Sequence, residues 1–542
     1  MDNIQNNEQI NYEPQFTNIS APCENLTIEK ESRSFLTLES VFAWLSLLAG
    51  YLFCRAFPAN SNPLGATLFI IALFVAATIV LKVRQTKIPL LSIIAAVSAI
   101  VISLTLILSG NAFLNFFAFS YALIVYFYFV YSSTGNSLKR GFSNFILIDF
   151  IKALFVLPFS SMGLMFKAMF SSRSGKKLPL KIIAGLGIAL IPTGIVLSLL
   201  SYDSSFLSLW NSIFKIDYFN LFSHIGSLLL GIPIGMYIFG SFLSCVDNNG
   251  KDILTVESCR KASKSLKKIP VLTAVFATAP VLFVYIIFFI SQWRYYISGF
   301  TGKLPENLSY AEYAREGFFQ LCAVSVINLI LIVSVFLLMR RTDDEPPIAL
   351  KILALLFSAF TLILISTALA KMVMYIDCYG LTQKRIYATW LMAVLALIFV
   401  FIAIQQIAPK LKTVAISFVV VVALFAVLCL SNVNGTIAKY NVKHYISGDL
   451  QTVDVSALSE LGDAAVPELV NLYEYTQEKL TETGKITKED FNLRSNIKST
   501  LERFEMKYSQ KDKTIYSFNL PRHRAEKAIE NWRKYFPRTN SF

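Results

Sequence analysis

Two polar stretches in a largely apolar chain carry the side chains best suited to chemistry. The first, SYAEYAREGFFQL at 309–321, repeats charged residues at i, i+3 and i+4, so they share one face of a helix. The second, KMVMYIDCYGLTQKR at 371–385, adds a carboxylate, phenols and cations. Together they could form a charged pocket that binds a lipid headgroup, a peptide or the C-terminal part of the chain. The alternative is a salt-bridge network that fixes helix packing. The candidate residues are Glu312, Arg315, Glu316, Lys371, Asp377, Tyr379 and Arg385.

Signatures of known catalytic and metal sites are missing from the sequence. It has no HExxH, no GxSxG, no Walker A loop and no acidic DxD pair beside an apolar run. Three His and seven scattered Cys without a CxxC pair argue against a metal centre or a disulfide framework. We therefore expect no catalytic residue, no metal ligand and no cofactor, and we favour a protein that is not an enzyme. An enzyme built on Glu312 and Asp377 stays open as an alternative.

The composition indicates which elements must position these side chains. Of 542 residues, 55% are hydrophobic and only 15% are charged, whereas soluble proteins average about a quarter charged. The apolar runs are continuous, which excludes the alternating strands of a β-barrel. The sequence predicts an all-α polytopic bundle of about eleven transmembrane helices. They fall at 38–56, 64–81, 88–108, 112–131, 182–200, 219–245, 269–291, 317–339, 348–374, 386–407 and 412–432.

One further apolar segment, 145–170, differs from these spans. It contains Asp149, Lys152 and Lys167 and is interrupted by Pro158. Basic residues flank it on both sides, which favours entry and exit on the same face of the membrane. We expect this segment to be interfacial or re-entrant.

The formal net charge of +14 is mainly a topology signal. Lys and Arg concentrate in alternate connectors such as 82–87 and 246–268, while 57–63 and 109–111 carry none. The positive-inside rule places the basic connectors in the cytoplasm. Residues 1–35, predicted to be a disordered tail, are then cytoplasmic as well. After an odd number of spans, the C-terminus lies outside. Because the charge is explained in this way, nucleic acid is not expected as a partner.

The C-terminal part of the chain differs sharply from the rest. Residues 433–542 are rich in charges of both signs and nearly neutral, as expected of a soluble domain. Asp454 and Thr487 are placed to cap helices, and Pro521 suits the first turn of another. The sequence therefore predicts a small extracytoplasmic helical domain after a transmembrane domain at 36–432.

Almost no ionisable residues lie inside the predicted spans, so no proton or sodium pathway is indicated. Asn328, in the middle of a span, is expected to bond a neighbouring helix. Three spans carry a central proline, at Pro192, Pro233 and Pro280. Broken helices can expose backbone groups to a transported solute, although most such prolines only kink the helix. A transporter or flippase is therefore a second hypothesis.

The order of several short motifs resembles a known family. SYAEYAREGFFQL and YGLTQKR are followed by IAKYNVKHY (437–445), ALSELGDAAVPEL (457–469) and FNLPRHRA (518–525). This combination resembles the bacterial multi-pass proteins described as domain of unknown function 4173 and its relative 4153, over roughly residues 40 to 535. The resemblance implies an integral membrane protein without an established activity. Positions that match its motifs are Glu312, Arg315, Glu316, Tyr379, Gly380, Arg385, Asn519 and Arg522.

Together these features favour a non-enzymatic protein of the bacterial plasma membrane. Its outer loops and C-terminal domain would sense or bind an envelope partner, either a protein or a lipid headgroup, or act as a scaffold. The alternatives are a transporter or flippase for a small solute or lipid, and an enzyme that acts on lipid-linked envelope substrates. The candidate sites are the polar cluster of the two stretches at 309–321 and 371–385 and a tail motif with Asn519 and Arg522.

Overall fold

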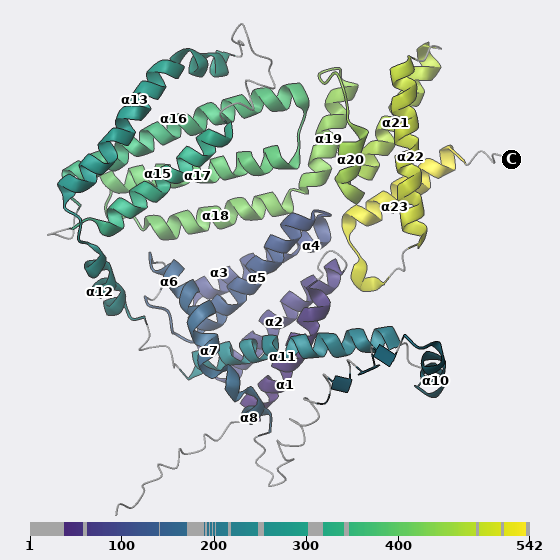
Figure 1. Cartoon of the computed structure of the whole chain (residues 1–542), viewed down its shortest axis with the longest axis horizontal. Coiled ribbons are helices and arrows are strands. Elements are labelled where there is room, and N and C mark those ends of the chain that lie inside the picture. The colour runs from purple at the N-terminus through teal and green to yellow at the C-terminus, as the bar shows by residue number, and fades with distance from the viewer. Residues whose placement is uncertain are drawn as a thin grey trace, which may run out of the picture.

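A computed structural model of the chain consists of helices and their connectors (Figure 1). Among the described residues, the only β contact is an isolated bridge between Ile269 and Met339. Eleven described helices are long and apolar enough to cross a membrane, which confirms the predicted polytopic helical fold. The structure describes residues 37–537 apart from 58–61, 140, 142, most of 171–201, 215–217, 248–253, 302–317, 341–345, 484–486 and 511–513.

The first bundle is formed by the N-terminal helices and α11. α1 and α11 pack antiparallel at very short range: a Cβ added to Gly231 would lie 2.6 Å from the backbone nitrogen of Tyr51. A Cβ added to Gly235 would lie 2.7 Å from the carbonyl oxygen of Ser46. Pro233 lies between these two glycines inside α11, so this part of the helix is a close helix contact. The bounds are α1 (Thr37–Ala56), α2 (Pro63–Val83), α3 (Leu90–Ser103), α4 (Thr105–Leu108), α5 (Ala112–Ser133) and α11 (Tyr218–Val246).

The eleven candidate spans of the structure are not the same eleven segments as the predicted ones, and they differ at two positions in the chain. The predicted span 182–200 lies mostly outside the described residues. The segment 146–169, predicted to be interfacial, has the length and hydropathy of a span. It is broken into α6 (Ile146–Ile151), a π turn η1 (Lys152–Val156), α7 (Leu157–Ser161), a 3-10 turn η2 (Met162–Leu164) and α8 (Met165–Met169).

Contacts at the two ends of segment 146–169 indicate its path. Asp149 accepts a hydrogen bond from the Tyr131 hydroxyl, near the end of α5, at 2.8 Å. The Met169 carbonyl accepts from Ser40 Oγ, near the start of α1, at 3.3 Å. Because successive helices alternate in direction, the end of α5 and the start of α1 belong to the same end of the bundle. Both ends of the segment therefore contact the same end of the bundle, and whether the segment is interfacial, re-entrant or spanning stays a prediction.

The second bundle is centred on α16. As predicted, Asn328 bonds neighbouring helices: its Nδ2 donates to Thr361 Oγ1 at 2.8 Å, and its Oδ1 accepts from the Tyr285 hydroxyl. α18 joins the two bundles, since Trp390 of α17 donates to its Leu424 carbonyl and Tyr121 of α5 packs on Phe425. The bounds are α12 (Val256–Leu266), which connects the bundles, α13 (Val271–Thr301), α15 (Phe318–Leu338), α16 (Ile348–Tyr379), α17 (Gln383–Ile407) and α18 (Thr413–Leu430).

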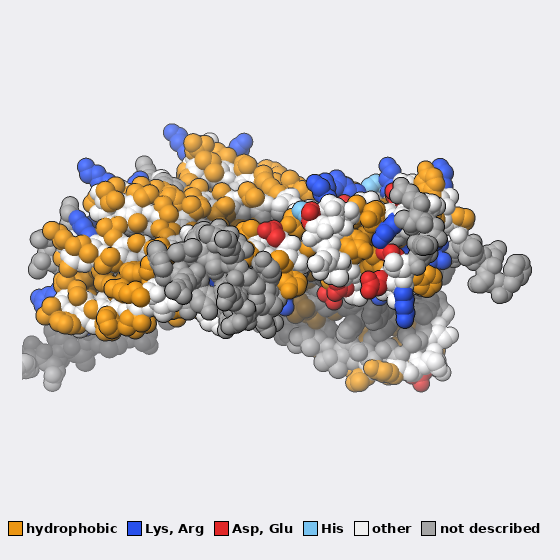
Figure 2. Space-filling view, turned by 90° about the horizontal axis from the view of Figure 1, so that it is seen from above, with side chains coloured by type: hydrophobic (Ala, Val, Ile, Leu, Met, Phe, Trp, Pro, Cys, Tyr) orange, Lys and Arg blue, Asp and Glu red, His pale blue; other side chains and the backbone are white. Residues whose placement is uncertain are grey.

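The C-terminal module, residues 433–537, packs around a hydrophobic cluster that includes the buried side chains of Trp532 and Tyr473 and extends to Leu114 of α5 and Leu428 of α18. Asp454 and Thr487 accept hydrogen bonds from helix-start amides, and Pro521 lies in the first turn of α23, as expected. Figure 2 shows charged side chains gathered over the module and apolar ones over the membrane helices. Its elements are α19 (Val433–Ile446), α20 (Val455–Glu460), η3 (Gly462–Ala465), α21 (Val466–Thr483), α22 (Lys488–Gln510), η4 (Ile515–Ser517) and α23 (Leu520–Tyr535).

The module lies at one end of the membrane helices, on the right in Figure 1. We call this the module end; it includes the connectors 109–111 and 380–382, which contact α19. The basic connector after α2 lies at the opposite end, where Arg84 pairs with Glu39 at the start of α1 at 2.8 Å. The helices thus separate the module from this basic connector.

Candidate functional site

The connector between α16 and α17 forms the membrane side of the candidate site. Gly380 ends α16 with a φ of 74°, in the left-handed region that favours glycine. The Arg385 guanidinium lies 4.0 Å from the ring centroid of Tyr375. It also donates to the carbonyls of Tyr379 and Gly380. Arg385 therefore holds the C-terminal end of α16.

The predicted polar cluster falls only partly within the described residues. Three members lie outside them, so the pairing of these residues with Lys371 or Arg385 stays a prediction: Glu312, Arg315 and Glu316. The other four lie toward the end of α16 or at the start of α17: Lys371, Asp377, Tyr379 and Arg385.

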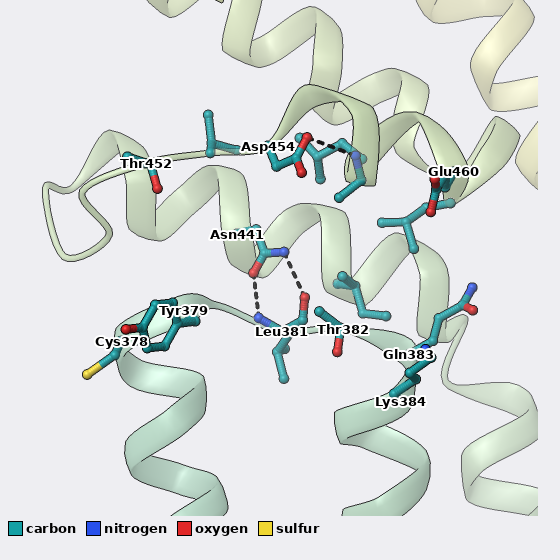
Figure 3. Close-up of a pocket in the computed structure, with 15 residues that line it drawn as sticks. Cys378, Tyr379, Leu381, Thr382, Gln383, Lys384, Asn441, Thr452, Asp454 and Glu460 are labelled. Carbon is teal, nitrogen blue, oxygen red and sulfur yellow. Dashed lines mark hydrogen bonds between the residues drawn. The ribbon is translucent and has the colours of Figure 1, made fainter. Parts of the chain in front are cut away.

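Asn441 of α19 joins the module to this connector. Its Nδ2 donates to the carbonyl of Leu381 at 2.9 Å, and its Oδ1 accepts from the amide of Leu381 at 2.7 Å (Figure 3). One side chain thus satisfies both backbone groups of a residue that has no helix or sheet partner. A Cβ on Gly380 would clash with Asn441 Oδ1, so space as well as φ requires glycine there.

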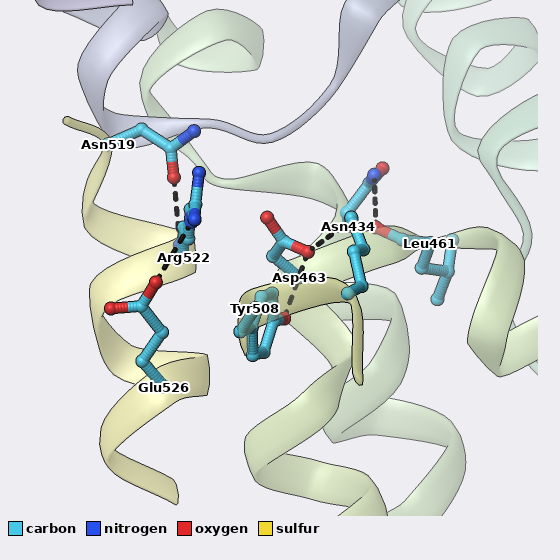
Figure 4. A network of polar contacts seen from close by, with 8 residues as sticks. Asn434, Leu461, Asp463, Tyr508, Asn519, Arg522 and Glu526 are labelled. Atoms are coloured by element: carbon cyan, nitrogen blue, oxygen red, sulfur yellow. Dashed lines mark hydrogen bonds and ion pairs between the residues drawn. The ribbon is translucent and has the colours of Figure 1, made fainter. Parts of the chain in front are cut away.

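A second set of amides is buried where the module meets both bundles. Asn434 of α19 is only 3% exposed, and its Oδ1 accepts from Asn111 Nδ2 and Gln383 Nε2, each at 2.8 Å. Its Nδ2 donates to the Leu461 carbonyl at 2.9 Å (Figure 4). Asn111 also donates to the Tyr387 hydroxyl at 2.7 Å. Because Asn111 belongs to the first bundle and Gln383 to the second, Asn434 links three parts of the molecule.

A cavity of about 520 Å³ lies between the connector and the module (Figure 3). Residues 378–384 form one wall, and α20 with the residues before it forms the other. The lining carries the cation of Lys384 and the carboxylates of Asp454 and Glu460. Asp454 is also the cap of α20, which fixes its orientation. Other polar lining residues are Thr382, Gln383, Asn441 and Thr452.

The chemistry of this lining suits binding. It provides hydrogen-bond donors and acceptors together with charges of both signs, which can orient a polar ligand or a peptide segment. In the described part of the chain, no three His, Cys, Asp or Glu residues are grouped so that they could hold a metal ion.

The predicted tail motif lies at the start of α23. Asn519 caps this helix by accepting from the Arg522 amide at 2.8 Å. Arg522 Nε donates to Glu526 Oε1, one turn further on, at 3.0 Å (Figure 4). On the neighbouring helix, the Tyr508 hydroxyl donates to Asp463 at 3.0 Å. Burial and the Asp463 carboxylate raise the pKa of the Tyr508 phenol, so it stays protonated as a donor.

Sequence reasoning misses the three asparagines that join the module to the membrane helices: Asn111, Asn434 and Asn441. Asn111 and Asn434 stand beside apolar runs, and Asn441 lies in the motif IAKYNVKHY, but neither signal indicates a contact partner. Asn111 and Asn434 are separated by 323 positions, so no short motif could have paired them.

These helices and their module define the class: a helical, multi-pass membrane protein. The chain belongs to the family described as Domain of unknown function (DUF4153), whose model matches residues 68–472. The match begins inside α2 and ends inside α21, so it includes the connector and the three asparagines, whereas Asn519 and Arg522 lie beyond it. The resemblance to family 4173 and the bacterial origin stay predictions. No curated protein and no solved structure shows a significant match to the chain.

Proposed function

We propose that the protein is a non-enzymatic binding component of the bacterial plasma membrane that takes an envelope partner at the cavity beside residues 378–384. One observation carries this proposal: the cavity is shared between the membrane helices and the module. A partner bound there contacts both parts at once. Its binding can therefore change how the module sits on the helices, which is what a sensor or scaffold needs.

The distribution of charge supports an extracytoplasmic module. The connector with Arg84 and Lys87 lies at the end of the helices opposite to the module. Since basic connectors favour the cytoplasm, the module and its cavity would face the envelope, and the N-terminal tail would be cytoplasmic.

The lining favours a protein segment as the partner. Lys384 and Glu460 are exposed and lie on opposite walls of the cavity (Figure 3). A peptide supplies carboxylate and ammonium groups for these two side chains. Its backbone also offers donors and acceptors to Thr382 and Gln383. A loop or terminus of an envelope protein satisfies all of these groups.

Photo-crosslinking in living cells tests this proposal. A photoreactive amino acid in place of Thr452, which is exposed on the cavity wall, should link the full-length protein to one envelope protein. Lys384→Glu and Glu460→Lys should each lower the adduct yield about fivefold, the loss expected for one exposed charge pair. Matched controls are Lys498→Glu and Glu474→Lys, on exposed parts of α22 and α21 outside the cavity lining. Equal yields from cavity variants and controls would show that the partner does not use this cavity.

A transporter or flippase stays the alternative function. Two of the three prolines that motivate it, Pro233 and Pro280, lie inside the continuous helices α11 and α13, and the glycines around Pro233 pack against α1. Movement of a solute or lipid by the purified protein in sealed liposomes would favour transport and count against a pure binding role.

A further inference from the structure

A second cavity, of about 410 Å³, lies between the module and the start of α2. It is separate from the cavity beside residues 378–384, because the two linings share no residue. Figure 1 shows the connector before α23 near the module end of the first bundle, and η4 contacts α2. The side chains that matter for its chemistry are Leu64, Thr514, Ser517, Arg522, His523 and Glu526.

Arg522 lines this cavity and has one hydrogen-bond donor without an acceptor. Its Nε donates to Glu526, while its Nη2 is buried and has no hydrogen-bond acceptor in the structure. A buried charged donor without an acceptor is costly, so an anionic oxygen beside this guanidinium would be stabilising. His523 is exposed beside it and can supply another donor.

The charge of the lining limits which anion fits. Glu526 offsets the charge of Arg522, so the pair is close to neutral before His523 is counted. A dianionic phosphate would meet repulsion from the Glu526 carboxylate. A phosphodiester carries a single negative charge and still offers two oxygens, so it matches the donors with less repulsion.

The surface that continues from the cavity is apolar. Leu64, in the first turn of α2, lines the cavity and begins a row spaced as one face of a helix. Leu68, Val75 and Ile79 of this row are about half exposed, at 48%, 51% and 57%. On the module side, Ile515 is 81% exposed next to the same helix end. We call the row the α2 stripe; it consists of Leu64, Leu68, Ala72, Val75 and Ile79.

We propose that this cavity binds a glycerophospholipid, with its phosphodiester at Arg522 and His523 and an acyl chain along the α2 stripe. The arrangement matches the geometry of a lipid, because a polar site lies at the end of a membrane span and an apolar face runs away from it. The lipid would fill the space between the module and α2 and hold the module against the bilayer surface. This proposal does not depend on a partner at the first cavity.

The test uses the full-length protein in maltoside detergent, which contains no phosphate. The probe is phosphatidylglycerol with a diazirine on one acyl chain, and the readout is the yield of adducts on peptides of α2. Arg522→Gln should lower this yield about tenfold, as expected for the loss of a charge-assisted hydrogen bond. Arg524→Gln, an exposed neighbour outside the lining, is the matched control and should leave the yield unchanged.

Two further arms keep the test decisive. Should Arg522→Gln unfold the module, His523→Ala, at an exposed position, should still lower the yield about threefold, the effect of one weaker hydrogen bond. Unlabelled phosphatidylglycerol should compete with the probe, whereas diacylglycerol, glycerophosphoglycerol and inorganic phosphate should not. Unchanged yields in both variants would overturn the proposal. Full competition by diacylglycerol would show that only chains bind, and full competition by inorganic phosphate would show a free-anion site; either result rejects the lipid assignment.

Discussion

The contact between α1 and α11 and the C-terminal module are held together by opposite means. Around Gly50, Gly231 and Gly235, two helix backbones touch with no side chain between them. In the module, by contrast, Arg533 binds Glu505 and Lys479 binds Asp490 across neighbouring helices. One region excludes side-chain volume, and the other adds ion pairs to a cluster of buried apolar side chains.

This difference follows from the surroundings of each region. Lipid offers no hydrophobic gain when two apolar helices meet, so helices associate through close backbone contact at small residues. The module carries many charged side chains, and partly exposed ion pairs add modest stability there. The first region should therefore respond to added volume and the second to changes in charge, salt and pH.

The largest effect is expected from one added methyl group in the α1–α11 contact. Gly231→Ala places a Cβ 2.6 Å from the Tyr51 backbone nitrogen, and the backbone cannot move away without separating the helices. We expect a loss of about 3 kcal/mol or more of stability, at the high end for overpacking. Thermal unfolding of the full-length protein in detergent measures it.

Gly226→Ala is the matched control in the same helix. Nothing lies within 4 Å of a Cβ added there, so its unfolding temperature should stay the same or rise slightly. An equal loss from both variants would mean that replacing glycine with alanine destabilises α11 wherever it is made. The close-contact interpretation of Gly231 would then be wrong.

The amide network lies at the boundary between the two regions and should show an intermediate effect. Asn434→Leu removes an acceptor from Asn111 and Gln383 and leaves the buried Leu461 carbonyl without its donor. We expect a loss of about 2 kcal/mol, within the range for unsatisfied buried polar groups. Hydrogen exchange of α19 peptides should speed up accordingly. Asn496→Leu, on the exposed face of α22, is the control; if it accelerates α19 exchange equally, the network does not dock the module.

Elements that depend on local sequence could be predicted. The apolar runs identify the spans, and Asp454 and Thr487 identify two helix starts because a cap bonds residues only two or three positions away. Asn328 was predictable as a bond between helices because a lone amide in a span has few other partners.

Contacts between distant segments could not be predicted. Gly231 and Gly235 have a spacing that favours helix contact, but nothing in the sequence selects Gly50 of α1 as their partner. Likewise, the segment 371–385 is polar enough to suggest a site, yet its role as the docking point for Asn441 depends on the three-dimensional arrangement. The cavity beside it combines residues from two separate parts of the chain, which no local pattern describes.

A smaller effect is expected in the module when an ion pair is removed. Arg533 contacts Glu505 at 2.6 Å and Glu502 at 3.5 Å, with partly exposed side chains. Arg533→Gln should cost about 1 kcal/mol at low salt, and less at 1 M salt because ions screen exposed pairs. Thermal unfolding at both salt concentrations measures the difference, with exposed Lys534→Gln as the control. The loss of stability in Gly231→Ala should not change with salt. If the loss in Arg533→Gln were also independent of salt, the two regions would not differ in the way described.

The smallest effect is a pH dependence of the module. Hydrogen bonds from the Thr487 hydroxyl and from Lys479 lower the pKa of Asp490. A carboxyl whose pKa is lowered in the folded state stabilises the protein at pH values above its pKa in the unfolded chain, about 3.9. This contribution is lost as the pH falls through the pKa in the folded state. Because the pair is partly exposed, solvent screening limits the contribution to about 0.5 kcal/mol.

Chemical denaturation of the module helices at pH 6 and pH 3 measures this contribution. The loss of stability in acid should be smaller in Asp490→Asn than in the unmodified protein. Glu474→Gln, an exposed carboxyl on α21, should leave the acid loss unchanged. If acid destabilised the packing of α1 on α11 as much as it destabilised the module, charge would contribute to both regions and the contrast between them would be wrong.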